Sequence, residues 1–175
     1  MKTYSKTILT NGLIILLGIL TVPGFAGPKG DSIVDVAIQL NSDGPFAGQF
    51  DTLIAAVLAA NPIVLETLDG NGKFTVFAPT DDAFAEIGLD PNSVAELDQA
   101  FLTDVLLYHV SHGNRKAKVI QRQKRIRVLK GGFVYSEGWV LIDNLGREVD
   151  LIVFDVKAAN GVIHAINRVL LPKAP

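Results

Sequence analysis

Two neighbouring carboxylates, Asp81 and Asp82, follow an apolar segment in FTVFAPTDDAF (residues 74–84). Paired carboxylates can act as a general acid and base or hold a metal ion. Adjacent side chains on a helix point about 100° apart, however, and calcium needs about six to eight oxygen ligands, usually from a spaced acidic loop. The first turn of a helix stabilises acidic side chains through its free N–H groups and its dipole. We therefore expect these carboxylates to stabilise a corner between a strand and a helix.

The three histidines, His109, His112 and His164, are the other candidates for chemistry. His109 and His112 could share a metal ion on a helix, but open zinc sites usually have three protein ligands and no third is apparent nearby. We expect His109 and His164 to be partly buried imidazoles that bond to the backbone or to neighbouring side chains. Ser111 beside His112 leaves a hydrolase of unknown substrate as an alternative, although no glycine-flanked nucleophile turn surrounds it. The sequence thus predicts no catalytic residue, no cofactor and no metal site.

The elements that position these residues fall into a helical first half and a β-rich second half. Apolar residues at helical spacing predict helices in SIVDVAIQLN, with Asp31 or Ser32 as N-cap, and in FDTLIAAVLAAN and PIVLETL. KFTVFAP predicts a strand covered on both faces that ends at Pro79, and Thr80 then starts a short helix. Two more helices are expected, one after Pro91 and one at about residues 100–107.

After Gly113 the sequence consists of short β-branched runs separated by turn signals. The turn signals fall at residues 130–132, 137–138, 143–144 and 160–161, which predicts an antiparallel sheet with hairpins. Asn160-Gly161 is the strongest of these hairpin signals, because both residue types tolerate positive φ. Helices followed by strands indicate a single α+β domain.

The first 26 residues have the pattern of a signal peptide. Lys2 and Lys6 precede an apolar run at residues 13–22, and VPGFA then supplies a helix breaker and small residues, so that we expect cleavage near Ala26. The run is shorter than the roughly 20 residues of a membrane-spanning helix, so we expect no transmembrane segment after cleavage. Residues 27–31 would form a short N-terminal segment before the domain. We predict a secreted protein, periplasmic or extracellular.

Charge and cysteine content narrow the choice of function. The 175-residue chain contains no cysteine, which excludes thiolate metal sites and disulfides. Its formal charge is −2, and it becomes −4 once Lys2 and Lys6 are removed, so we expect no general affinity for nucleic acid. Thirteen acids and one base lie between residues 31 and 104, whereas residues 115–130 contain eight bases and no acid.

The basic stretch 115–130 has two interpretations. Its bases can face solvent on an edge strand, where charge discourages sheet-to-sheet aggregation. They can also concentrate positive potential for an anionic polysaccharide or lipid headgroup. No aromatic residue is interleaved among them, which argues against single-stranded nucleic acid. The candidate contact residues in this stretch are Arg115, Lys116, Arg122, Lys124, Arg125 and Arg127.

Three segments, in order, resemble motifs of the fasciclin (FAS1) domain family: FTVFAPTDDAF, LLYHV (residues 106–110) and NGVIHAINRVLLP (residues 160–172). SIVDVAIQLN and FDTLIAAVLAA are similar to the opening helices of the family, so the resemblance covers residues 32–172. It implies an α+β wedge, in which a twisted β-sandwich of about seven strands has helices packed at one side. It also implies a non-catalytic secreted or cell-surface module for adhesion or for matrix and envelope association.

The same resemblance implies binding residues. In animal relatives the Tyr-His segment is tied to integrin adhesion, which makes Tyr108 and His109 candidates, although burial favours a packing role for both. The sequence departs from the family pattern at Asn167, where Asp is usual, at Ala165, where a larger aliphatic residue is common, and in the basic stretch. The expected partner is a protein or polysaccharide of the cell surface or matrix.

Overall fold

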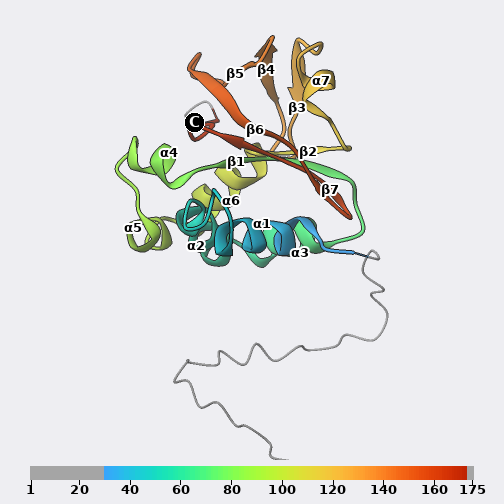
Figure 1. The fold of residues 1–175 in the computed structure, drawn as a ribbon. Coiled ribbons are helices and arrows are strands. Elements are labelled where there is room, and N and C mark those ends of the chain that lie inside the picture. Colours follow the sequence, from blue (N-terminus) through green and yellow to red (C-terminus); the bar gives the residue numbers. More distant parts are fainter. Residues whose placement is uncertain (1–29, 173–175) are drawn as a thin grey trace, which may run out of the picture.

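The computed structural model describes residues 30–172, so the predicted signal peptide and its cleavage near Ala26 lie outside the described part. A layer of helices packs along one side of a twisted, strongly bent sheet (Figure 1). The helices are α1 (Ile33–Ser42), α2 (Asp51–Ala59), α3 (Pro62–Asp69), α4 (Asp81–Ala85), α5 (Pro91–Ala95), α6 (Gln99–Tyr108) and α7 (Ala117–Ile120). The strands are β1 (Phe74–Pro79), β2 (Val110–His112), β3 (Arg125–Arg127), β4 (Phe133–Glu137), β5 (Val140–Ile142), β6 (Glu148–Ala158) and β7 (Gly161–Ile166). The predicted α+β class is confirmed.

Local capping explains where several helices start. Ser32, one of the two N-cap residues that the sequence predicts, forms a capping box with Asp35 at the N-terminus of α1. Asn61 caps α3 through its side chain and Asp90 caps α5 in the same way. Thr80 occupies the N-cap position of α4, but its side chain makes no capping hydrogen bond. The helical half of the chain is therefore specified largely by residues close in sequence.

The seven strands form one mixed sheet in the order β2-β1-β7-β6-β5-β4-β3. All neighbouring pairs are antiparallel except the second and third strands of the order, β1 and β7, which run parallel. The two end strands also approach each other, because the N–H of Leu129, just after β3, donates to the carbonyl of Val110 in β2 at 2.8 Å. The sheet thus nearly closes on itself, and helices cover its outside along β1 and β7 (Figure 1).

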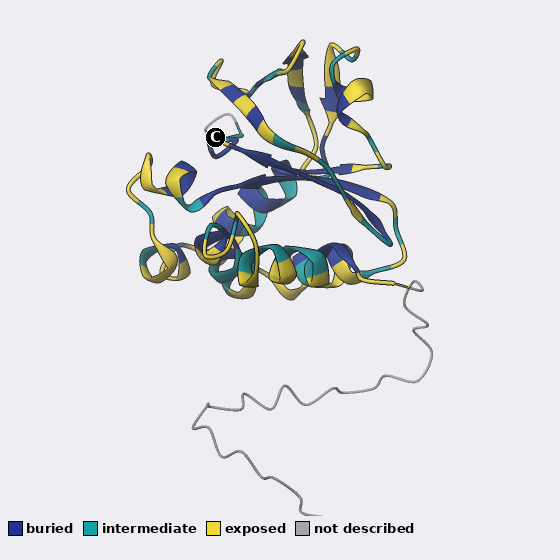
Figure 2. Cartoon of the chain, in the orientation of Figure 1, coloured by how far each residue is buried: buried dark blue, intermediate teal, exposed yellow. Residues whose placement is uncertain are grey.

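The bent sheet separates two apolar cores. Phe74, Val76 and Ala78 of β1 belong to the core shared with the helices. Phe77 points the opposite way and packs inside the sheet with residues such as Leu141 of β5. Every residue of β1 and of β7 is buried, as the continuous dark strands in Figure 2 show. The predicted burial of β1 on both faces is confirmed.

The hairpin between β6 and β7 corrects one prediction. Ala158 pairs with Gly161, so the loop residues are Ala159 and Asn160, and neither Asn160 nor Gly161 has a positive φ. The turn is where the sequence indicates, but the reason is different. A Cβ on Gly161 would lie 2.1 Å from the carbonyl oxygen of Phe74, so glycine is required by the close approach of β1. Asn160 is required by the hydrogen bonds of its side chain.

None of the helices in residues 30–172 is by itself both long enough and apolar enough to cross a membrane. The consecutive helices α2 and α3 meet the length and composition criterion only as a pair that is bent by 115°.

Candidate functional site

The carboxylates at the corner between β1 and α4 have a structural role. The Asp81 carboxylate accepts a hydrogen bond from the N–H of Thr52 at 2.9 Å, and the Asp81 N–H donates to the carbonyl of Gln49 at 2.8 Å. Asp81 therefore caps α2, whose own N-cap residue, Phe50, has no acceptor in its side chain. Asp82 is exposed in the first turn of α4. Within residues 30–172 no group of three or more histidine, aspartate or glutamate side chains could hold a metal ion.

Tyr108 and His109 lie inside the molecule, with exposed fractions of 0% and 3%. The Tyr108 hydroxyl donates to the carbonyl of Phe133 at 3.0 Å, and burial raises the pKa of this phenol to about 12. His109 donates from Nδ1 to the carbonyl of Val105 at 2.7 Å and accepts at Nε2 from the N–H of Leu170 at 2.9 Å. Burial lowers the pKa of His109 to about 4, so the imidazole is neutral at pH 7.

This geometry ties the end of α6 to β4 and to the segment after β7. Because Tyr108 and His109 are enclosed by the fold, they are not part of the outer surface. The packing role that the sequence favours for them accounts for every hydrogen bond they make.

His164 organises the start of the basic stretch. Its Nε2–H donates to the carbonyl of Arg115 at 2.8 Å, and its Nδ1 accepts from the N–H of Asp155 at 3.2 Å. The Asp155 carboxylate in turn accepts from the N–H of Ala117 at 2.8 Å, at the N-terminus of α7. Burial lowers the pKa of His164 below its ordinary value. Asp155 has a φ of 58°, so backbone strain in β6 is retained to make this connection.

Ser111 and His112 do not form a nucleophile–base pair. The Ser111 hydroxyl donates to the carbonyl of Arg127 at 2.7 Å and accepts from Nε of Arg115 at 3.2 Å, so both sides of the oxygen are engaged. The His112 ring lies against Phe74, with the ring centroids 5.4 Å apart. The arrangement joins β2 to β3 and presents no activated hydroxyl.

The basic stretch crosses α7 and β3. In β3, Arg125 and Arg127 are exposed while Ile126 between them is buried, which is the predicted alternation on an end strand of the sheet. The Arg125 guanidinium lies 4.7 Å from the centre of the Phe133 ring, a cation–π contact.

Two other cations of this stretch have protein partners. Arg115 is half-buried and donates to the side chains of Ser111 and Gln123, and Lys130 forms an ion pair with Asp104. The cations that remain exposed around α7 are Lys116, Lys118, Arg122 and Lys124. Whether they bind a partner stays a prediction.

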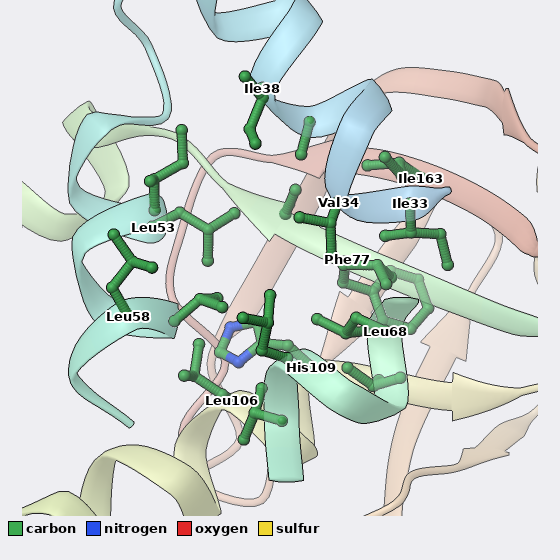
Figure 3. A pocket seen from close by; sticks show the side chains of 18 residues that line it. Ile33, Val34, Ile38, Leu53, Leu58, Leu68, Phe77, Leu106, His109 and Ile163 are labelled. Atoms are coloured by element: carbon green, nitrogen blue, oxygen red, sulfur yellow. The ribbon is translucent and has the colours of Figure 1, made fainter. Parts of the chain in front are cut away.

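An apolar cavity of about 100 Å³ lies between α1, α2, α3 and β1 (Figure 3). Aliphatic side chains form most of its wall, and Ile38 and Leu58 line it where it meets solvent. His109 also lines it, but both nitrogens of this imidazole are bonded to the backbone. The cavity can hold an apolar group and presents no free polar atom for a reaction.

Sequence reasoning missed the aromatic residues Trp139 and Phe154, and it identified Asn160 only as a turn residue. Asn160 is buried in the hairpin between β6 and β7, and Trp139 and Phe154 form an exposed aromatic contact. Trp139 is the only tryptophan of the chain and follows Gly138 in a turn signal, so a large aromatic at a hairpin tip was a usable cue. Phe154 lies within an apolar run, which gives no cue to its exposure.

The fold and the buried Tyr-His segment define a domain in which the sheet nearly closes beside a helical layer. The family model for the fasciclin domain matches residues 48–172, and the chain belongs to this family. This confirms the resemblance of the three motifs.

Known proteins agree with this assignment. Protein sll1483 of Synechocystis sp. is 38% identical over 128 residues, which are 70% of this chain and 67% of that protein. Cell surface glycolipoprotein MPB83 of Mycobacterium bovis is 27% identical over 158 residues, which are 88% of this chain and 67% of that protein. The solved FAS1 domain pair of the insect cell adhesion molecule fasciclin I superposes with a TM-score of 0.64 at 18% identity. The superposition covers 82% of this chain and 51% of the solved chain, so it shows the fold alone.

Proposed function

We propose that this fasciclin domain is an exported, non-catalytic binding module that associates with the cell surface, envelope or extracellular matrix through its outer surface. The observation that carries this proposal is that the candidate catalytic side chains of the domain already use their polar atoms in structural hydrogen bonds. His109, His164 and Ser111 each direct their polar atoms to backbone or side-chain partners that hold strands and helices together. What remains for recognition is the outside of the molecule.

Export and surface association have separate support. The signal-peptide pattern of residues 1–26 supports export. One relative carries the description cell surface glycolipoprotein, and the superposed solved pair comes from a cell adhesion molecule. These descriptions belong to those proteins, and they favour the same setting for this chain.

A second candidate function rests on the basic stretch 115–130. Lys116, Lys118, Arg122 and Lys124 are exposed around α7 on a protein that is otherwise acidic. Such a cluster attracts an anionic polysaccharide or a lipid headgroup, and the attraction weakens as salt rises. Replacing these residues with glutamine should abolish retention on an anionic column.

Fractionation of the producing cell tests the main proposal. Antibody detection should find the processed chain outside the cytoplasm and bound to an envelope, surface or matrix fraction, from which a pull-down recovers its partner. A broad panel of ester, glycoside and peptide substrates should show no turnover. A chain that is confined to the cytoplasm would refute export, and turnover that is lost in His112→Ala would establish a hydrolase instead.

A further inference from the structure

The short helix α7 is fixed between two surface features from distant parts of the sequence. At its C-terminal end, the Ser136 hydroxyl is within hydrogen-bonding distance of the carbonyls of Ile120 and Gly138, at 3.1 and 3.5 Å, which holds the β4–β5 hairpin tip against the helix. At its N-terminal end, the Ala117 N–H donates to the carboxylate of Asp155 in β6 at 2.8 Å. The helix, the hairpin tip and the middle of β6 are therefore one continuous surface.

Large apolar side chains are exposed on this surface. Trp139 at the hairpin tip and Phe154 of β6 lie edge to face, with ring centroids 5.3 Å apart, although they come from separate elements. Each is 45% exposed, and Val119 on the outer side of α7 is 44% exposed. A cluster of this kind at the surface indicates a partner that removes it from water.

Four exposed cations belong to the α7 segment of the same surface. Lys116, Lys118, Arg122 and Lys124 are exposed before, within and after α7. Across residues 30–172 the ion pairs involve other cations, namely Lys130, Arg147 and Arg168. The acidic side chains beside the cluster are Glu137 at the hairpin tip, the exposed Asp150, which lies opposite Val140 in the β5–β6 pair, and Asp155, which is bonded to the backbone of α7. The surface therefore combines exposed aromatic rings with a local excess of positive charge.

We propose that this α7 patch, made of Val119, Trp139, Phe154 and the four cations, docks onto a lipid membrane that contains anionic phospholipid. The inference rests on the proposed function, because it names the partner through which an exported module would associate with the envelope. The cations contact headgroup phosphates, and the two aromatic rings enter the interfacial layer, where tryptophan is favoured because one part of its ring is apolar and its N–H stays hydrated.

The geometry favours a membrane over a polysaccharide. Sugar rings stack on the open faces of aromatic side chains, and a platform for a polymer presents such faces in a common plane. Trp139 and Phe154 are inclined at 62°, so the pair offers a wedge and no common plane. A bilayer interface accepts a wedge, because lipids adjust to its shape.

Trp139 makes the test specific, because it is the only tryptophan in the chain. The full processed chain is titrated with vesicles of neutral phosphatidylcholine and with vesicles that also contain phosphatidylglycerol, while tryptophan emission is recorded. We expect a blue shift with anionic vesicles only, its loss in high salt, and quenching by lipids brominated on their acyl chains. The predicted N-terminal leader carries no tryptophan, so any residual leader cannot produce this signal.

Two variants separate the roles of charge and of the aromatic pair. Lys118→Gln/Arg122→Gln should weaken binding to anionic vesicles at least about tenfold, because each cation near such a surface contributes about fivefold. The control, Lys130→Gln/Arg168→Gln, removes the same charge elsewhere and should bind within about twofold of the parent protein. Phe154→Ala should also weaken vesicle binding severalfold, but it should leave binding to soluble dextran sulfate unchanged.

Several results would overturn the inference. The first is an unshifted and unquenched tryptophan spectrum with anionic vesicles, a result that needs no variant and so does not depend on how a variant folds. The second is vesicle binding that is no tighter than dextran sulfate binding and that Phe154→Ala leaves unchanged, since it would assign the patch to a polymer. The third is dimer formation without lipid that shifts the tryptophan emission to the blue, because a second copy of the chain would then cover the patch. Envelope retention with no response of Trp139 would leave the proposed function standing and refute only the membrane as partner.

Discussion

Asn160 connects three segments that are far apart in sequence, and its replacement by alanine gives the sharpest test of the fold. Its side-chain oxygen accepts from the N–H of Ile33 at 2.7 Å, and its side-chain nitrogen donates to the carbonyls of Leu68 at 2.6 Å and Gly70 at 2.9 Å. Ile33 is the first residue of α1, and Leu68 lies in the last turn of α3. One amide therefore satisfies backbone groups at the ends of two helices that cannot find partners within those helices.

The magnitude follows from these bonds and from their burial. Asn160 is fully buried, so alanine would leave one N–H and two carbonyls without partners in a place that water does not reach easily. Each such loss costs about 1–2 kcal/mol, so Asn160→Ala should lower the free energy of unfolding by about 3–6 kcal/mol. That is a large fraction of the roughly 5–15 kcal/mol by which a domain is stable.

Urea denaturation followed by circular dichroism measures this change. With a slope of about 2 kcal/mol per molar urea, the midpoint should fall by about 2 M at unchanged slope. Asn92→Ala is the matched control, because Asn92 is an exposed asparagine in α5, and its stability should stay within about 0.5 kcal/mol of the parent protein. If Asn160→Ala lost no more than about 1 kcal/mol, the double capping role would be wrong.

Three further predictions concern the core. The pKa of His109 is about 4 in the folded state against an ordinary 6.5, so at pH 7 the imidazole is uncharged in both the folded and the unfolded chain. Between pH 6.5 and pH 4 only the unfolded chain binds the proton, so the free energy of unfolding should fall by up to about 3 kcal/mol as the pH decreases across this range. Urea midpoints across this window should show a shallower pH slope in His109→Gln, and an equal slope would contradict the assignment. Gly161→Ala should destabilise by about 3 kcal/mol or more, since its Cβ would meet the carbonyl of Phe74, and soluble protein with the parent melting temperature would show that this approach is relaxed in solution. Tyr108→Phe should cost about 1–2 kcal/mol in thermal unfolding by leaving the carbonyl of Phe133 unpaired, and an unchanged melting temperature would argue against that hydrogen bond.

Local signals in the sequence predicted much of the fold. Ser32 marks a helix start through hydrogen bonds that span only a few residues, and its effect does not depend on the rest of the chain. The turn signals at residues 130–132, 137–138 and 143–144 fall between successive strands for a similar reason, because glycine and asparagine in a short loop act on adjacent backbone. The burial of β1 on both faces was visible in its apolar residues, which only Thr75 interrupts.

Features that depend on distant contacts were not predictable in this way. The parallel pairing of β1 with β7 joins Phe74 to Gly161, and no local pattern encodes it. α7 is a single turn, and its N-terminus is capped by Asp155 of β6 and not by a neighbour in sequence. The exposure of Phe154 continues the alternation of Glu148, Asp150 and Ile152 along β6, which the apolar residues around Phe154 obscure in the sequence. The α7 patch therefore emerges only when these separate segments are assembled.

The position of β7 has a consequence for biosynthesis. It is the last strand in chain order, yet it lies between β1 and β6 and contributes to both apolar cores. While the ribosome is still adding the residues of β7, β1 lacks its parallel neighbour and Asn160 cannot yet join α1 to α3. Stable tertiary structure must therefore wait until nearly all of the domain has been translated. Such a delay is compatible with the export that we propose, because a chain without stable tertiary structure can cross a membrane unfolded.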